Sequence, residues 1–578
     1  MTRWPLGFAA ALALTACTTV PDVPAPRVQP VTVGIIAIND FHGALEPPKQ
    51  SVLVAREGSQ PIAVPAGGAA WLAAAVDRIR ARYSAHVMVS AGDLIGASQI
   101  SSSIFLDEPT IGVMNRIGLD FSAAGNHEFD RGRQELLRMQ EGGCETFTRR
   151  EPCQVERFAG ADFRFLSAST YTEDGSTLFP ATGIKSFGSG KTEVSVGFIG
   201  LTLKETPSLV SPDGVAGLTF GDEAEAINAQ IPLLEAKGAD AVVVLIHQGG
   251  RDTGEPDPNG CDALSGDILP ILARLDPRVD VVVSGHTHQA YVCDYGAIDP
   301  SRPFLLTSAG VSGKLVTDIT LRIDPEAGEV VAKEARNVIV QSRPYAASGG
   351  EVLLSPLYER FEPRQDIAHY VQLYSERAAE LALRRVGRID RAALKGEGAD
   401  GGSAGNLIAD AQLAATRAAG AQIAFMNPFG VRAPLEPQAD DWLTFGQLYN
   451  AQPFDNVLIT QTMTGAEIKA VLEQGLDEEG PEQHLTPSAG FVYWYDRSRN
   501  SGDRIVRIEF MGQPLDPRAE YRVTTNSFLA NGGDGFTGLA AQREAVTSVS
   551  DIAALEEWVS GEVPRAVPQE QREIEAKP

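Results

Sequence analysis

Long hydrophobic runs are missing from the body of this 578-residue chain. Beyond the first few residues no stretch has the length and uniform apolarity of a transmembrane helix, so we expect a soluble pair of domains outside the inner membrane. Basic residues are also scarce, since 49 Lys and Arg face 75 Asp and Glu and give a formal net charge of -26. Such a surface repels a polyphosphate chain and excludes nucleic acid polymers as partners, although metal ions and a few arginines can reverse the field locally for a small anion.

Cysteine is scarce too, with five residues in the whole chain. One of them, Cys17, belongs to the N-terminal segment, and none has the CxxC spacing of a zinc or redox site. The other four form an even set in an oxidising compartment, so we predict two disulfides paired in sequence order, with free buried thiols as the alternative. The predicted pairs are Cys144 with Cys153 and Cys261 with Cys293.

The N-terminus has the pattern of an export signal. A short apolar run that starts at Trp4 ends in Leu14-Thr15-Ala16-Cys17, which resembles the bacterial lipobox, in which Cys17 becomes the lipidated first residue. We therefore predict a lipoprotein signal peptide at 1–17 and a linker at 18–30, with ordinary soluble secretion as the alternative. Because Thr18 replaces the aspartate associated with inner-membrane retention, we expect the anchor on the periplasmic side of the cell envelope, in the outer membrane.

From Val31 onward, apolar β-rich runs alternate with helical stretches, a pattern typical of an α/β sandwich with buried central strands. Regular strands and hairpin-like turns from Lys314 to Gln341 indicate where this first domain closes. A helical segment follows, which is either a rigid connector or an ordinary packed helix. The predicted boundaries are 31–345 for the first domain, 346–385 for the helical connector, 386–563 for a second domain of mixed strands and helices, and 564–578 for a charged, disordered tail.

Metal-capable side chains directly follow several of the apolar strands. In an open α/β sheet the carboxyl ends of the strands form the edge where sites assemble. A lone histidine at a strand end is more often structural, but most of the eight histidines of the chain fall in these clusters. Imidazole together with carboxylate favours zinc, manganese, iron or cobalt over calcium. The clusters are Asn39-Asp40-Phe41-His42, Gly92-Asp93, Gly125-Asn126-His127-Glu128, Ile246-His247-Gln248 and Gly285-His286-Thr287-His288.

The order of these clusters closely resembles the calcineurin-like metallophosphoesterase superfamily, which implies a four-layer αββα sandwich. The resemblance assigns one divalent metal ion to Asp40, His42 and His288, a second to Asn126, His247 and His286, and a bridging position to Asp93. Two ions held in this way activate a water and stabilise charge on phosphoryl oxygens. The resemblance also implies that His127 faces the phosphate and that Asp130 orients it, with a helix N-terminal carboxylate as the alternative for Asp130.

Motifs in the second half resemble the C-terminal domain of the 5'-nucleotidase and UDP-sugar hydrolase family. They are Gly405-Asn406-Leu407-Ile408-Ala409-Asp410, Asn427-Pro428-Phe429-Gly430-Val431-Arg432, Gln452-Pro453-Phe454-Asp455-Asn456 and the run from Thr525 to Phe536. By that similarity a second α+β domain recognises the substrate. Phe454 and Phe528 sandwich a base, Asn456 touches base or sugar, Asp534 accepts from ribose hydroxyls, Arg432 binds phosphate, and Asn427 belongs to the same substrate-binding set. Core packing is the alternative for the two phenylalanines.

The sequence departs from the family pattern at two places. Residues 397–403 contain no basic residue where family members commonly carry an arginine, and Pro428-Phe429 replaces a Gly-rich pair. The leading hypothesis is metal-dependent hydrolysis of nucleotide phosphate esters, of the 5'-nucleotidase type, outside the cytoplasm and for nucleotide scavenging. The departures keep 2',3'-cyclic-nucleotide phosphodiesterase and nucleotide-sugar hydrolase as alternatives, and a non-catalytic nucleotide-binding lipoprotein is the alternative from another class. The membrane is expected as a partner only through the anchor, and the sequence leaves the oligomeric state open.

Overall fold

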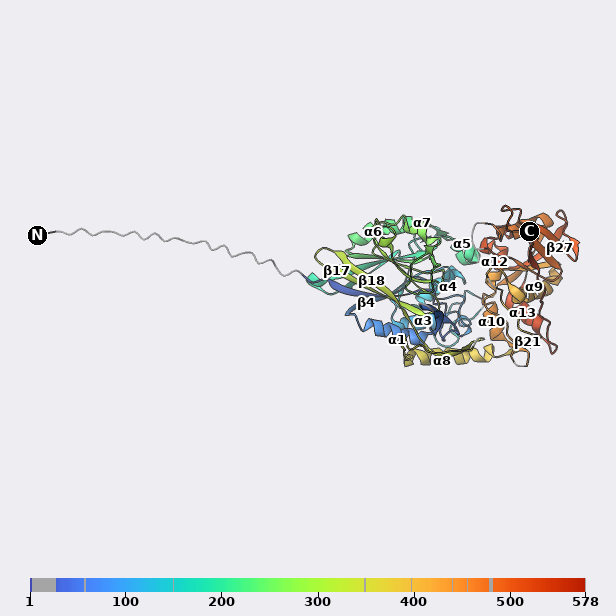
Figure 1. Ribbon diagram of the computed structural model, residues 1–578, viewed down its shortest axis with the longest axis horizontal. Coiled ribbons are helices and arrows are strands. Elements are labelled where there is room, and N and C mark those ends of the chain that lie inside the picture. Colours follow the sequence, from blue (N-terminus) through green and yellow to red (C-terminus); the bar gives the residue numbers. More distant parts are fainter. Residues whose placement is uncertain are drawn as a thin grey trace.

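A computed structural model describes residues 1–2, 28–56, 59–148, 150–210, 212–347, 350–396, 398–438, 440–454, 456–477 and 482–576. The predicted signal peptide, apart from its first two residues, and most of the predicted linker lie outside these ranges, as does the predicted lipidation site Cys17. Figure 1 shows two domains side by side, with the first half of the chain in one and the end of the chain in the other.

Two six-stranded sheets form the centre of the first domain, in the orders β18-β17-β1-β4-β5-β6 and β15-β16-β14-β11-β9-β8. The strands of the first sheet are β18 (Glu329–Ile339), β17 (Leu315–Asp324), β1 (Val31–Ile38), β4 (Ala85–Ser90), β5 (Phe121–Ala123) and β6 (Arg164–Leu166). Those of the second are β15 (Ala290–Asp294), β16 (Leu305–Ala309), β14 (Val281–Ser284), β11 (Ala241–His247), β9 (Val194–Thr202) and β8 (Thr182–Phe187).

Alternation of side chains along the strands explains the layering. In β1, Val33 and Ile35 point into the apolar layer between the two sheets, whereas Ile36 and Ile38 point to the opposite face, under the helices. The helices on that face are α1 (Ala69–Arg80), α3 (Glu108–Ile117), α4 (Arg133–Glu141) and α8 (Gln365–Ala382). The outer face of the second sheet is covered by α6 (Glu223–Ala236) and α7 (Ile268–Leu272). The predicted four-layer αββα sandwich is therefore confirmed.

The central strands of both sheets are parallel, which decides where the site assembles. In the first sheet β1, β4, β5 and β6 run in one direction, and in the second sheet β9, β11, β14 and β16 also run parallel to one another. The chain segments that follow β1, β4, β5, β11 and β14 are those with the metal-capable clusters. The carboxyl ends of the strands thus bring these segments to one edge of the sandwich.

The second domain is built on two smaller sheets, in the orders β25-β22-β29-β24-β30 and β28-β27-β26-β31. Their strands are β25 (Thr486–Pro487), β22 (Ile423–Met426), β29 (Glu520–Asn526), β24 (Val457–Thr464), β30 (Val546–Ser550), β28 (Gln513–Pro514), β27 (Ile505–Phe510), β26 (Phe491–Tyr495) and β31 (Glu573–Glu575). The main helices are α9 (Gly402–Thr416), α10 (Phe445–Ala451), α11 (Gly465–Gln474) and α13 (Asp551–Val559). Mixed strand pairing and peripheral helices give the expected α+β class.

The predicted helical connector contains α8, which lies along the lower edge of the first domain in Figure 1 and ends beside the second domain. Its buried side chains Ile367, Tyr370 and Tyr374 pack into the same apolar cluster as α1 and α3. Since the following strand β21 (Arg385–Arg388) already pairs with β23 (Trp442–Thr444) of the second domain, α8 is a packed helix of the first domain that leads directly into the second.

Both predicted disulfides are present, Cys144 with Cys153 and Cys261 with Cys293. The first closes a nine-residue separation after α4, and the second joins the loop before α7 to β15. Among the described residues, no helix combines the length and apolarity needed to cross a membrane.

The expectation of a disordered tail at 564–578 is wrong for the residues that the structure describes there. Strand β31 pairs in parallel with β26, and the side chain of Arg572 is buried. Its guanidinium donates to both carboxylate oxygens of Asp410 on α9, at 2.8 and 3.0 Å, and to the carbonyl of Pro487 at 2.9 Å. The charged composition of the segment suggested solvation, but one buried bidentate ion pair and one strand are enough to hold it against the second domain.

Substitution of this arginine tests the role of the tail. Arg572→Ala leaves the carboxylate of Asp410 without its buried partner, so we expect the free energy of unfolding of the second domain to fall by about 3 kcal/mol. Gln571→Ala, at an exposed neighbouring position, is the control and is expected to change it by less than about 0.5 kcal/mol. Equal denaturant midpoints for the Arg572 variant and the wild type would contradict this role.

Candidate metal centre

Left-handed backbone at non-glycine residues marks the edge where the strands end. Asp40, His42, Asp93, His286 and His288 all have positive φ angles, between 47° and 69°. This conformation is unfavourable for residues with a side chain, and it persists where the surrounding structure enforces it, typically at functional sites. All five belong to the predicted metal-ligand set.

The first predicted ligand group does come together. The Nε2 atoms of His42 and His288 lie 3.1 Å apart, and they lie 3.8 and 3.5 Å from the same carboxylate oxygen of Asp40. The Nδ1 atom of His42 faces the carbonyl of Gly96 at 2.9 Å, which leaves Nε2 for a ligand role. Asn39 donates to Asp40 at 2.6 Å, and it also bonds Gly310 and Ala309, so this carboxylate is held from behind.

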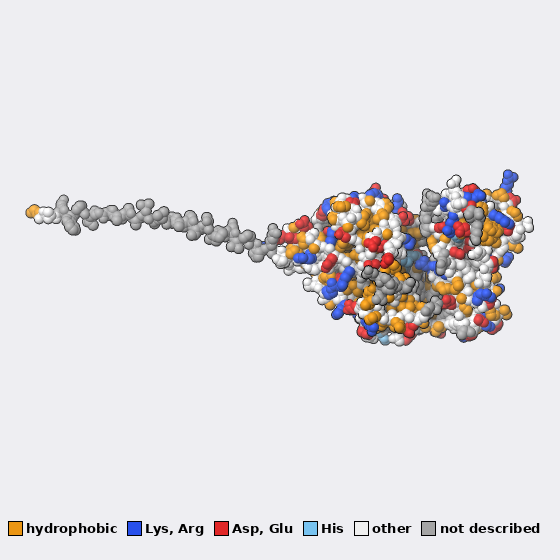
Figure 2. Space-filling view, in the orientation of Figure 1, with side chains coloured by type: hydrophobic (Ala, Val, Ile, Leu, Met, Phe, Trp, Pro, Cys, Tyr) orange, Lys and Arg blue, Asp and Glu red, His pale blue; other side chains and the backbone are white. Residues whose placement is uncertain are grey.

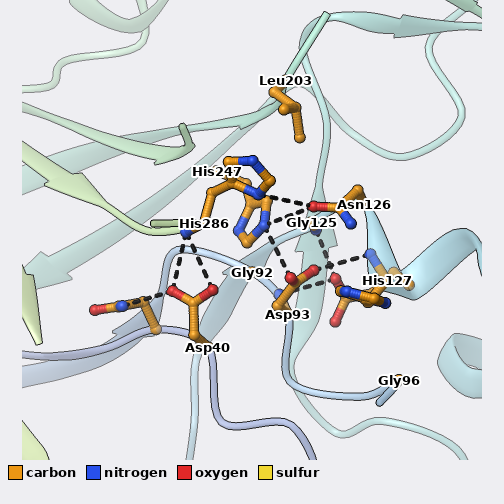
Figure 3. A network of polar contacts seen from close by, with 12 residues as sticks. Asp40, Gly92, Asp93, Gly96, Gly125, Asn126, His127, Leu203, His247 and His286 are labelled. Carbon is orange, nitrogen blue, oxygen red and sulfur yellow. Dashed lines mark hydrogen bonds and ion pairs between the residues drawn. The ribbon is translucent and has the colours of Figure 1, made fainter. Parts of the chain in front are cut away.

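The second predicted group is centred on Asn126, as Figure 3 shows. The side-chain oxygen of Asn126 lies 3.1 Å from Nε2 of His247 and 3.1 Å from Nδ1 of His286. The other nitrogen of His247 faces the carbonyl of Ala91 at 2.8 Å, so Nε2 is again the atom that is free for a ligand role.

Asp93 lies between the two groups. Its Oδ2 atom is 3.0 Å from Nε2 of His247 in the second group and 3.7 Å from Nε2 of His42 in the first. Its other oxygen accepts from the backbone N–H of His127 at 2.9 Å. The predicted bridging residue therefore occupies the position that bridging requires.

The donor set fits divalent metal ions. Ligand atoms of Asp40, His42 and His288 lie within 4.8 Å of one another, and so do those of Asp40, Asp93 and His247. Two atoms bound to one ion at about 2.1 Å lie about 3 to 3.5 Å apart, which is the spacing seen here. Buried carboxylates, imidazoles and an amide oxygen are the ligands of zinc, manganese, iron and cobalt.

Burial and neighbouring charges set the protonation states of the site. Burial, with charged neighbours such as His247, lowers the pKa of His286 to about 3, and burial, with Arg432, lowers that of His288 to about 3, so both are neutral imidazoles, the form that ligates metal. Burial raises the pKa of Asp40 to about 7, and nearby Asp93 adds to the shift. Two carboxylates held this close without a cation are mutually unfavourable, which is a further reason to assign a cation here.

His127 lies close to the predicted ligands, since its ligand atom is within 4.8 Å of those of His42 and Asp93, and its role at the phosphate stays a prediction. Its Nδ1 atom lies 2.8 Å from a carboxylate oxygen of Asp130, so the proposed orienting contact exists. Burial lowers the pKa of His127, but Asp130 and Asp93 outweigh that effect and raise it to about 9. Asp130 is the residue directly after the short 3-10 turn His127–Phe129, and the N-cap of the following helix α4 is Gly132, so the alternative of a helix N-terminal carboxylate is not supported.

Residues of the second domain reach this edge from the opposite side. The ring of Phe454 lies nearly parallel to the imidazole of His127, with centroids 6.2 Å apart, and the guanidinium of Arg432 lies 5.7 Å from the ring of Phe454. Figure 2 shows a hollow between the two domains with histidine and basic side chains in it. The predicted phosphate-binding arginine and one predicted stacking phenylalanine therefore face the metal centre.

The remaining predicted substrate residues also belong to the second domain, and several of them are hydrogen-bonded to one another or to neighbouring side chains. Asn427 donates to the carboxylate of Asp534 at 2.7 Å and accepts from Asn526 at 3.0 Å, while Asn456 accepts from Ser527 at 3.3 Å. Burial raises the pKa of Asp534 to about 6, against the hydrogen bond from Asn427. The ring of Phe528 lies against the backbone of Gly533, and it forms no ring pair with Phe454 among the described residues. The base sandwich stays a prediction.

Both halves of the chain match known protein families. The calcineurin-like phosphoesterase family matches residues 34–290, and the 5'-nucleotidase C-terminal domain matches residues 385–541. The chain belongs to the 5'-nucleotidase family. It is similar to the Endonuclease YhcR of Bacillus subtilis, with 29% identity over 541 residues that cover 92% of this chain and 40% of that protein, so it spans less than half of this relative.

Other 5'-nucleotidase relatives match along nearly their whole length. The chain is 25% identical over 576 residues to a probable 5'-nucleotidase of Treponema pallidum, covering 91% of this chain and 90% of that protein. Among solved structures it is similar to a 5'-nucleotidase precursor from Thermus thermophilus, with a TM-score of 0.68 and 26% identity over 95% of this chain and 100% of that one.

One residue of this 5'-nucleotidase family site was not assigned from the sequence. The buried carboxylate of Glu128 accepts from the backbone N–H groups of Asp93, Leu94 and Gly125 at 2.9, 2.8 and 2.6 Å. It thereby ties the loop after β4 to the loop after β5 and fixes Asp93 relative to Asn126. The available signal was its place directly after Asn126-His127, in a cluster otherwise made of ligands.

Glu128→Gln tests this positioning role. One oxygen of Glu128 accepts from both Asp93 and Gly125, and an amide nitrogen in its place would face two donors. We therefore expect divalent-ion affinity, measured by calorimetric titration of the metal-free protein, to fall about 10- to 100-fold. The matched control is Glu141→Gln at the end of α4, whose affinity should equal that of the wild type. Unchanged affinity in the Glu128 variant would refute the assignment.

Proposed function

We propose that this protein is a 5'-nucleotidase-type phosphoric ester hydrolase that removes phosphate from nucleotides with the help of two divalent metal ions. One observation carries the proposal: the ring of Phe454 of the second domain faces His127, with Arg432 beside that ring, next to the ligand groups of the first domain. An aromatic face and a guanidinium next to a metal centre are what a nucleotide monophosphate requires, because the face binds the base by stacking and the guanidinium matches phosphate oxygens.

In this proposal Asp40, His42 and His288 hold one ion, Asn126, His247 and His286 hold the other, and Asp93 bridges them. Zinc, manganese, iron and cobalt suit this mixture of imidazole and oxygen ligands. When bound, the ions supply Lewis-acid chemistry and a nucleophile at neutral pH for in-line displacement at phosphorus.

The residues of the chain provide the remaining steps. Asp130 accepts from Nδ1 of His127, which fixes the ring and leaves Nε2 to donate a hydrogen bond or a proton to the phosphate. Arg432 binds phosphate oxygens, and Asn427 holds Asp534 in place to accept from ribose hydroxyls. Phe454 presents its ring parallel to His127, where it would stack on the base.

A phosphate-release assay tests the proposal. Nucleoside monophosphates are incubated with the metal-stripped protein and with protein reloaded with Zn²⁺, Mn²⁺, Fe²⁺ or Co²⁺. We expect release only with metal, and we expect Asp93→Asn and His127→Ala to remove most of it. Nucleotide binding without turnover in every metal would favour the non-catalytic binding protein instead.

The same assay decides between ester classes. The absence of a basic residue at 397–403 and the presence of Phe429 beside Asn427 make 2',3'-cyclic nucleotides and nucleotide-sugars the informative comparisons. A higher kcat/KM for either one than for the 5'-monophosphates would assign that activity to the site. A requirement for the base is checked with a simple aryl phosphate, which lacks both base and ribose.

We also propose that the protein acts outside the cytoplasm, anchored by a lipid on Cys17 to the periplasmic side of the outer membrane. The two disulfides support this location, because such bonds persist in oxidising compartments. The scavenging of nucleotides is the role we assign to it there. Cys17→Ser is expected to move the protein from the membrane fraction to the soluble fraction, and unchanged fractionation would exclude the anchor.

A further inference from the structure

Asp107 has a carboxylate that its own helix does not use. It precedes α3 in left-handed conformation, with φ of 62°, and its side chain makes no capping hydrogen bond to that helix. It is fully buried, and it accepts from Ser102 at 2.6 Å, from Arg131 at 2.5 Å and from the backbone N–H of Gly96 at 3.3 Å. One of these partners, Gly96, belongs to the loop beside the metal centre, so this strained, buried acid indicates a role in supporting that centre.

Gly96 connects this carboxylate to two functional groups. Its N–H donates to Asp107, and its carbonyl faces Nδ1 of His42 at 2.9 Å. A Cβ atom at this position would lie 2.7 Å from both Asp130 and His127, so the backbone of Gly96 fits between the ligand and the His127–Asp130 pair. Figure 3 shows the Gly96 loop below His127. A shift of the Gly96 backbone would therefore move His42, and it would change the space available to the side chain of His127.

Arg131 binds the same carboxylate and is the next residue after Asp130. Its guanidinium also reaches the carbonyl of Ser103 at 3.4 Å, on the short helix α2 (Ile100–Ser103). If its partner Asp107 is neutralised, the charge of Arg131 is left beside Asp130, where it competes with His127 for that carboxylate.

A residue of the second domain lies near Asp107, Arg131 and Ser103. Tyr449 of α10 is buried, its hydroxyl lies near Ser103, Arg131 and Asp107, and α10 packs against α2, the helix of Ser103. Arg150 of the first domain lies over its ring at 5.3 Å. A residue of the second domain thus contacts the support of His42 and His127 from behind.

We propose that Asp107 and Arg131 are positioning residues that hold His42 and His127 in place, and that Tyr449 makes this support depend on the seating of the second domain. The inference rests on the proposed function but concerns residues that touch neither metal nor substrate. It predicts that the metal centre is complete only when the Ser103 contact with the second domain is made.

The first experiment is a calorimetric titration of the metal-free full-length protein with Mn²⁺ or Zn²⁺. We expect Asp107→Asn to weaken one of the two binding events about 10- to 100-fold and to leave the other unchanged. The control is Glu135→Gln, which breaks a buried ion pair with Arg138 at 2.6 Å in the first turn of α4 of the same domain. It should lose stability and keep both affinities.

A double variant separates positioning from folding. Asp107→Asn combined with Arg131→Gln restores charge balance, so a merely structural role predicts recovery of both stability and metal affinity. We expect stability to recover while the affinity stays low, because Ser102 and Gly96 donate to different oxygens of Asp107 and an amide offers only one acceptor oxygen. If Asp107→Asn alone fails to fold, this double variant carries the test.

Coupling to the second domain is measured with kcat. We expect Tyr449→Phe to lower kcat in the wild type by at least about threefold and to have no further effect in Arg131→Gln. If the effects of Tyr449→Phe and Arg131→Gln on kcat were additive, or if Asp107→Asn kept the metal affinities of the wild type, this inference would be overturned while the proposed function stood. A wild-type protein that binds no divalent ion would overturn the proposed function as well, so the two failures are distinguishable.

Discussion

Asp93→Asn is expected to remove almost all phosphate release and to weaken binding of both metal ions. Its carboxylate is the one group that faces both ligand sets, with one oxygen 3.0 Å from His247 and 3.7 Å from His42. Asparagine keeps the size of the side chain but offers a neutral oxygen, so each ion loses an anionic ligand at once. A loss of several kcal/mol of transition-state stabilisation corresponds to a fall in kcat of about a thousandfold or more.

Metal-dependent stabilisation gives this prediction a second measurement. An ion that binds only the folded protein raises its stability in proportion to the logarithm of its concentration over Kd. Adding Mn²⁺ or Zn²⁺ should therefore raise the Tm of the wild type clearly and that of Asp93→Asn much less. Asp120→Asn, a carboxylate before β5 and away from the ligand edge, is the control and should respond like the wild type. A normal metal response in Asp93→Asn, with activity intact, would mean that the two ions are not bridged by this residue.

The metal ligands could be predicted from the sequence because each follows an apolar strand directly. Parallel strands bring such segments to one edge whatever the details of packing, so Asp40, Asp93 and His247 needed no knowledge of the loops between them. Glu128 and Asp107 are different. Their partners are backbone N–H groups such as those of Leu94 and Gly96, whose directions depend on loop conformations that no residue pattern specifies.

The second domain shows the same limit. Residues of the motifs around Asn427 and Asp534 do meet: Asn427 directly follows β22, Asp534 lies in the turn after β29 and a short helix, and β22 and β29 are neighbours in one sheet. The place of Phe454 beside His127 depends instead on how two domains pack, which is a long-range property of the whole chain. The buried Arg572 was missed for a third reason: a polar composition predicts solvation unless one specific partner, here Asp410, is known.

His127→Ala is expected to lower kcat about 10²- to 10⁴-fold while leaving metal binding close to that of the wild type. The imidazole is held by Asp130 at 2.8 Å and faces the second domain, and although it lies close to His42 and Asp93 it is assigned to neither of the two predicted ligand groups. Its loss therefore removes a donor to the phosphate or the leaving oxygen without removing a ligand. Asp130→Asn, which keeps the imidazole but weakens its orientation, should have a smaller effect of about 10- to 100-fold.

Substrates with different leaving groups reveal which of these two tasks His127 performs. If it protonates the leaving oxygen, His127→Ala should slow a nucleoside monophosphate far more than an aryl phosphate, because a phenolate leaves without protonation whereas a ribose alkoxide does not. If it only stabilises charge on the phosphoryl oxygens, both substrates should slow alike. Loss of metal in His127→Ala would contradict both roles, since it would place the imidazole among the ligands, and the distances around Asp93 and Asn126 would then have to be reassigned.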